Sequence, residues 1–150
     1  MSARTYRRVV TGLDAEGRSC VIIDGEVPRF DAATNLVWRT AALPADNAGR
    51  DDAAAPYTMD MLHDGGSNFL LVELPPNMGR FMHATDTIDY LVVLEGTVVL
   101  ELESGEARLG PGDFIVDRGV IHAWRNDGPE TAVMASITLP ALPVGKGRTV

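Results

Sequence analysis

Residues 68–74 read Asn68-Phe69-Leu70-Leu71-Val72-Glu73-Leu74, a short apolar run with glycines just before it and prolines just after it. The run is too short for an ordinary helix, and it is rich in branched side chains. Residues 19–23 and 97–103 are similar runs, in which apolar side chains follow one another or recur at every second position. Such runs are typical of strands, because successive side chains of a strand point to opposite faces of a sheet.

Turn residues separate these runs roughly every eight to twelve residues, as in all-β domains. Glycine in these clusters supplies positive φ and proline presets φ, so each cluster can reverse the chain. We find no stretch that keeps helical spacing of apolar residues over three turns. The pattern therefore predicts an all-β domain, folded as a sandwich, a jelly roll or a small barrel.

Composition limits the partners that this domain can have. The chain has 150 residues, of which 45% are hydrophobic and 23% are charged, as expected for one folded domain. Its net charge of −8 disfavours nucleic acids and anionic membranes, and no apolar run is long enough to span a bilayer. Cys20 is the only cysteine and no secretory signal is evident, so we expect a cytoplasmic protein without disulfides.

Two segments differ from the strand pattern. Residues 41–56 are rich in alanine and aspartate and have almost no side chain that could anchor a core. We interpret them as a long loop, either a solvated excursion or a mobile lid over a site. Residues 144–150 form a tail that we expect to be frayed or draped over a neighbour.

The histidines stand in two spaced motifs. The first motif is Gly79-x3-His83-x-Thr85-x3-Asp89-x6-Gly96, and the second is Gly112-x6-Gly119-x2-His122-x3-Asn126. If the first motif stays extended, alternation places His83, Thr85 and Asp89 on one face. The second motif supplies another imidazole from a different strand.

These motifs resemble those of the cupin superfamily over about residues 65–140. The matching residues include Gly96, His83, Gly119, His122 and Asn126. The chain departs from the family pattern where a second histidine is Thr85, a glutamate is Asp89 and a proline is Arg118.

The resemblance implies an antiparallel jelly-roll barrel with a site inside its mouth, and commonly a homodimer. We expect the barrel over residues 65–143, with residues 1–64 adding N-terminal strands and the long loop. The amino-acid sequence within the motifs is similar to that of small single-domain bacterial and fungal cupins, some of which are named oxidoreductases.

His83, Asp89 and His122 form the expected site. Two imidazoles and one carboxylate are the ligand set that holds Fe(II) in many oxygenases, and Mn, Zn or Ni are alternatives. The hydroxyl of Thr85 is a poor metal ligand, and Asp89 is one methylene shorter than glutamate. The same three residues could therefore carry protons without a metal, or simply bond to one another inside a polar barrel.

Other residues complete the hypothesis. Trp124 shares the face of His122 and could stack on a substrate, Thr85 could contact it, and Arg118 could attract a carboxylate. We expect Asn126 to stabilise a turn and Tyr90 to pack outward against a sheet or a subunit.

The sequence thus predicts a metal-dependent enzyme acting on a compact organic substrate by oxidation, decarboxylation or isomerisation. The alternative is a metal-free domain that binds a small molecule or performs acid–base chemistry.

Overall fold

The computed structural model describes residues 4–150, whose regular elements are ten strands and one 3-10 turn. The strands are β1 (Arg7–Leu13), β2 (Ser19–Glu26), β3 (Thr34–Thr40), β4 (Ser67–Leu74), β5 (Thr87–Glu95), β6 (Val98–Leu102), β7 (Glu106–Leu109), β8 (Phe114–Asp117), β9 (His122–Arg125) and β10 (Ala132–Pro140). The turn η1 spans Met59–His63. Every strand pairs antiparallel to its neighbours, which confirms the predicted all-β fold. No helix in this part of the chain is long and apolar enough to cross a membrane.

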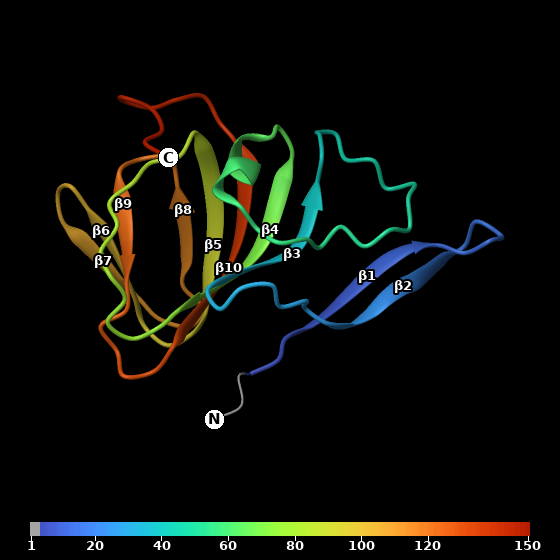
Figure 1. The fold of residues 1–150 in the computed structure, drawn as a ribbon, viewed down its shortest axis with the longest axis horizontal. Helices are drawn as coiled ribbons and strands as arrows, with labels where there is room; N and C mark the ends of the chain where they lie inside the picture. The colour runs from blue at the N-terminus through green and yellow to red at the C-terminus, as the bar shows by residue number, and fades with distance from the viewer. Residues whose placement is uncertain (1–3) are drawn as a thin grey trace.

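The strands form three sheets, ordered β3-β4-β10-β5-β8, β7-β6-β9 and β1-β2. The first two share one apolar core, in which Leu91, Val93 and Met134 of the five-stranded sheet pack with Val98 of the three-stranded sheet. The β1-β2 hairpin projects away from this body (Figure 1). The jelly-roll core is therefore built by β3–β10, and the hairpin is an arm beside it.

The inner face of the five-stranded sheet changes from apolar to polar along its strands. Near one end, Met134 of β10 lies between Val72 of β4 and Val93 of β5. Near the other end, four strands in succession contribute a polar side chain at paired positions. These residues, here called the polar row, are Asn68 of β4, Thr138 of β10, Asp89 of β5 and Asp117 of β8. One end of the barrel is thus a conventional core, and the other end is polar.

The long loop after β3 turns toward the hairpin. The guanidinium of Arg8 donates to Asp52 (Nη1 to Oδ1, 2.8 Å) and to the Val37 carbonyl, which ties the loop to β1. Arg8 is buried there, so its charge needs a carboxylate partner. The contacts of this segment lie on the hairpin and not over the histidines, which contradicts the lid hypothesis for residues 41–56.

The C-terminal tail folds back onto its own barrel. Thr149 makes two hydrogen bonds with Ala84, both of 2.9 Å: its backbone N–H donates to the Ala84 carbonyl, and its hydroxyl oxygen accepts from the Ala84 N–H. The Arg148 N–H also donates to Asp86. The tail is therefore bonded to the segment that follows His83, neither frayed nor draped over a neighbouring molecule as we expected.

Candidate functional site

The two motif histidines meet across the sheets. His83 lies before β5 and pairs with His122, the first residue of β9, through two backbone hydrogen bonds of 2.9 and 3.0 Å. Their ring centroids lie 4.6 Å apart. The structure thus brings together two side chains that are 39 residues apart in the sequence, 122 minus 83.

Both imidazoles use the same nitrogen for structural bonds. Nδ1 of His83 lies 2.9 Å from the Phe81 carbonyl, and Nδ1 of His122 lies 2.9 Å from the Val120 carbonyl. A carbonyl can only accept, so Nδ1 carries the proton in each neutral ring. Nε2 of each ring therefore keeps its lone pair free for an external partner.

Asp117 is a site residue that the sequence analysis missed. Its Oδ2 lies 3.0 Å from Nδ1 of His122, and both side chains are buried. Burial by itself lowers the pKa of His122, but the Asp117 carboxylate outweighs it, so the net pKa is raised. Burial lowers the pKa of His83, and the charge of His122 adds to this effect. His122 is therefore the more readily protonated of the two imidazoles.

Asp89 points into the polar end of the barrel from β5. Burial raises its pKa to about 6, against the opposing effect of a hydrogen bond from Thr87. The Thr87 hydroxyl donates to Asp89 (2.7 Å), so the Thr85 hydroxyl must donate in turn to Thr87 (2.7 Å). Thr85, Thr87 and Asp89 therefore form a buried hydroxyl relay that ends on the carboxylate.

Tyr57 also belongs to this region, although nothing in its sequence context indicated it. Burial raises its pKa to about 12, and the charge of Asp89 contributes to that shift. Tyr57 follows the long loop, so the last residues of that loop reach the barrel while its middle reaches the hairpin. His63, which we had treated as a loop residue, lies at the end of η1 and accepts a long bond from the Asp86 N–H (3.4 Å).

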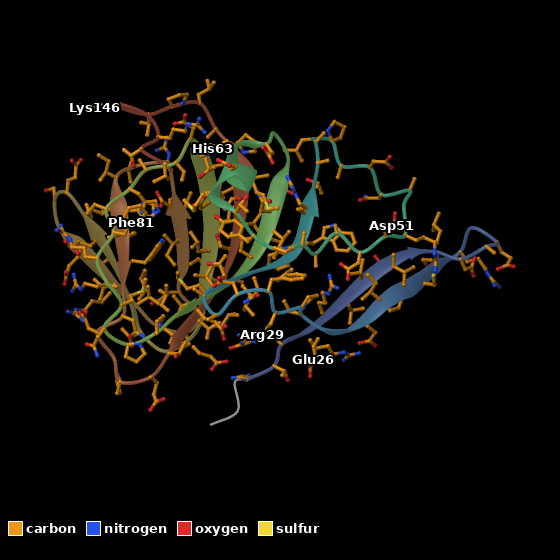
Figure 2. All side chains as sticks on the ribbon, viewed as in Figure 1. Glu26, Arg29, Asp51, His63, Phe81 and Lys146 are labelled. Carbon is orange, nitrogen blue, oxygen red and sulfur yellow. The ribbon has the colours of Figure 1, made fainter. Side chains whose placement is uncertain are left out.

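Aromatic rings line the histidine pair on both sides. Phe81 stacks on His83 with ring centroids 4.8 Å apart, and Trp124 meets His122 edge-on at 5.6 Å. Figure 2 shows Phe81 beside β9 at the side of the barrel farthest from the hairpin. Trp124 also packs against the apolar core, so its position supports both of its expected roles.

The remaining candidates lie elsewhere. Arg118 is exposed in the turn after β8, while its neighbour Asp117 points inward. Asn126 bonds to the Leu74 and Glu130 carbonyls and to the Gly128 N–H, which confirms its turn-stabilising role. Tyr90 is exposed on the outer face of the five-stranded sheet.

The donor set does not assemble as a metal centre. Among residues 4–150, no group of three or more His, Cys, Asp and Glu side chains has a geometry that could hold a metal ion. The free Nε2 atoms suit a metal, but Asp89 is bonded to Thr87 and lies in register with Asp117, not with the histidine pair. Metal binding by His83, Asp89 and His122 together therefore stays a prediction.

Metal uptake tests this arrangement. We expect protein purified without a chelator or a histidine tag to take up Fe, Mn, Zn or Ni only substoichiometrically, because two imidazoles lack a third ligand. The Thr85→His variant should take up more, because it adds an imidazole on the same inner face. Elemental analysis after dialysis against each metal measures both. Stoichiometric metal in the wild type that His122→Ala removes would establish the three-ligand site instead.

A large groove lies away from the histidines. It has a volume of about 1150 Å³ and separates the hairpin from the outer face of the five-stranded sheet. Val10, Ile22, Trp38, Phe69 and Leu94 are among its lining residues. The groove therefore concerns the hairpin and not the polar end of the barrel.

Comparison with known proteins agrees with the fold and the motifs. The family model for the cupin domain matches residues 70–138. Phomopsin biosynthesis cluster protein D of Diaporthe leptostromiformis is 33% identical over 94% of this chain and 82% of its own length. The cupin-domain-containing oxidoreductase srdB of Neurospora crassa is 30% identical over 88% of this chain and 71% of its own length.

A solved structure supports the architecture alone. A crystal structure of a protein from Thermus thermophilus aligns with a TM-score of 0.53 at 20% sequence identity. The alignment covers 77% of this chain and 91% of that one.

Proposed function

This chain belongs to the cupin domain family, and from that premise we propose that it is an enzyme that moves protons on a small substrate inside its barrel. Asp89 is the base and protonated His122 is the acid. The proposal rests on the buried position of Asp89 at the end of a hydroxyl relay, and on the Asp117 carboxylate 3.0 Å from Nδ1 of His122.

The two groups differ in charge, and the surroundings of each shift its pKa upward. Burial raises the pKa of Asp89 to about 6, so a large share of it is a free base at neutral pH. The pKa of His122 is raised because the Asp117 carboxylate outweighs burial, so its protonated form is stabilised. General acids and bases are most effective when their pKa values lie near the working pH.

Such a pair suits reactions that begin with removal of a proton beside a carbonyl. Asp89 would take the proton, and His122 would donate one to the oxygen on which charge develops. Isomerisation and dehydration share the stabilised anion of this step. This is the metal-free alternative that the sequence analysis left open.

Oxidation is the second candidate, because several relatives carry the word oxidoreductase in their names. Its electrons would have to pass to an acceptor supplied from outside the chain. A divalent metal stays part of that second candidate only, subject to the uptake test above.

Hydrogen exchange in D₂O tests the leading candidate even while the natural substrate is unidentified. The purified protein is incubated with a panel of small ketones and 1,3-dicarbonyl compounds, and loss of the α-proton signal is followed by NMR. We expect accelerated exchange of at least one member. If no compound exchanges faster than with heat-denatured protein, while oxygen consumption is observed with the same panel, oxidation takes its place.

We also propose that the protein is a homodimer. The outer face of the five-stranded sheet carries exposed apolar side chains in one register line: Phe69, Ile137, Tyr90 and Val116. Phe114 extends this patch and is 82% exposed. Contiguous exposed apolar surface of this kind marks an interaction site, and a second copy presents the same apolar face.

We also propose that the protein works in the cytoplasm. Its single cysteine, Cys20, is compatible with such a reducing compartment.

Light scattering measures the assembly. We expect a mass of twice the 16.1 kDa chain at micromolar concentration. Ile137→Lys should shift the protein to the monomer, because it places a charge at the centre of the apolar patch. Glu103→Lys, an exposed change in the turn between β6 and β7, is the control. A wild-type mass near 16.1 kDa would rule the dimer out.

A further inference from the structure

Hydrogen-bond acceptors at the polar end of the barrel have no donor from the chain. The side-chain oxygen of Asn68 has no hydrogen-bond partner. Neither carboxylate oxygen of Asp117 has one, because the Nδ1–H of His122, although 3.0 Å from Oδ2, donates to the Val120 carbonyl. Asn68 is 1% exposed and Asp117 is 4% exposed, so bulk water does not satisfy them. Unsatisfied buried acceptors are costly and uncommon in folded proteins, so a donor from outside the chain is expected here.

The nearby donors are already committed. The amide nitrogen of Asn68 donates to the Met61 carbonyl (3.0 Å) and to Thr138 (3.2 Å). Thr87 donates to Asp89 and Thr85 donates to Thr87, so the Thr85 oxygen offers only lone pairs. Thr138 accepts from Asn68, and its own hydroxyl proton is the one hydroxyl donor left in the polar row.

The histidines and Arg39 at the edge of the sheet also affect the number of free hydrogen-bond donors and acceptors. Each imidazole uses its Nδ1–H on a backbone carbonyl. This leaves an accepting Nε2 on neutral His83, whereas Nε2 of His122 accepts in the neutral ring and donates in the protonated ring. The guanidinium of Arg39, paired with Asn68 at the edge strand, donates to the loop carboxylate of Asp64 (3.4 Å). The polar end is therefore rich in acceptors and poor in free donors.

Flat rings stand next to these acceptors. Phe81, His83, His122 and Trp124 follow one another with ring centroids 4.8, 4.6 and 5.6 Å apart. Such a series favours a planar ligand, because aromatic faces and edges pack against a flat partner.

We propose that this site takes a small planar molecule that is not an anion and carries two adjacent hydrogen-bond donors, as a 1,2-dihydroxybenzene does. The inference deepens the proposed function and rests on it for the location of the site. A carboxylate is excluded, because it would bring a further negative charge beside Asp89 and Asp117. This proposal differs from the expectation that Arg118 attracts a carboxylate substrate, which stays a prediction.

Binding of three matched probes tests the proposal. Catechol, 1,2-dimethoxybenzene and benzoate share one ring and differ in donors and charge. Saturation-transfer NMR and Trp fluorescence, on protein treated with EDTA, measure their affinities. We expect catechol to bind about tenfold or more tightly than the other two, because only its two adjacent hydroxyls can donate to both unsatisfied oxygens of Asp117. Benzoate binding as well as catechol, no binding of catechol, or catechol binding only after metal is added would overturn the proposal.

Variants of the acceptor residues test where catechol binds. Asp117→Asn should weaken catechol binding about tenfold, because it replaces an accepting oxygen by an amino group. Thr85→Val removes another acceptor at nearly constant volume and should weaken binding to a smaller extent. Asp51→Asn, in the exposed loop near the hairpin (Figure 2), is the control and should bind catechol as the wild type does. If Asp117→Asn does not fold, Thr85→Val decides, and unchanged binding in a folded variant overturns the proposal.

The ligand class and the reaction can fail separately. Catechol binding without any hydrogen exchange in the carbonyl panel would leave the ligand class in place and remove the proton-transfer function. Exchange of a carbonyl compound without catechol binding would leave the proton-transfer function in place and remove the ligand class.

Discussion

Replacing Asp89 by asparagine is expected to slow α-proton exchange by roughly 10²–10⁴-fold, the usual contribution of a general base. Asparagine keeps the shape of the side chain and can still accept the bond from Thr87, but it cannot take up a proton. NMR rates in D₂O measure the loss. Asp51→Asn, the matched change at an exposed aspartate, should retain the wild-type rate.

The pH profile adds an independent signature. Since burial raises the pKa of Asp89 to about 6, the wild-type exchange rate should rise as pH increases through that value, and it should fall again at higher pH where His122 loses its proton. Exchange that falls as pH increases through this range, or an Asp89→Asn variant of full activity, would contradict the assignment.

Stability should change in the opposite direction to activity. The raised pKa means that folded protein holds the Asp89 proton more tightly than unfolded protein does. The resulting stabilisation is complete below the unfolded pKa and is lost as pH rises through about 6. Asp89→Asn cannot lose a proton, so its melting temperature relative to wild type should be higher at pH 8 than at pH 5. A variant that loses activity through misfolding would instead melt well below the wild type at both pH values.

Replacing Gly119 by alanine is expected to lower the free energy of unfolding by roughly 2–4 kcal/mol, combining left-handed strain with overpacking. Gly119 has a φ of +70°, and a Cβ there would lie 2.8 Å from the Thr85 carbonyl oxygen and 3.0 Å from that of Thr87. The turn that delivers His122 would have to move away from the relay segment. Urea denaturation measures the change.

Gly112 provides the matched control for this effect. Its φ is +88°, but a Cβ there meets nothing within 4 Å. Gly112→Ala should therefore cost only the conformational strain, about 1–2 kcal/mol. If Gly119→Ala is no more destabilising than Gly112→Ala, the close approach to Thr85 and Thr87 does not matter for the fold.

The strands themselves could be predicted because their signals are local. The run at residues 68–74 became β4, and the runs at 19–23 and 97–103 fall on β2 and β6. Alternation between neighbouring side chains and the glycines at turns act over a few residues, so they can be read without knowing the rest of the fold. That His83 and His122 belong to one site was implied by the resemblance of the two motifs to the cupin superfamily, and not by their spacing alone.

Asp117 and Asn68 could not be found in this way. Asp117 lies next to Asp89 and Asn68 next to Thr138 only because of the pairing register between strands far apart in the chain. Asp117 stands beside Arg118, and parity alone does not say which of the two faces the interior. Register is set by packing of the whole sheet, because a shift of one residue exchanges the two faces of a strand.

The sequence by itself thus determined the all-β class, the positions of the strands and the two histidine motifs, since periodicity and turn chemistry are local properties. The tertiary structure decided which polar groups gather at one end of the barrel, that the long loop follows Arg8 to the hairpin, and that the tail bonds to Ala84. Those outcomes depend on where a buried charge or an unpaired backbone group finds a partner. That partner can come from any part of the chain, so only the complete fold identifies it.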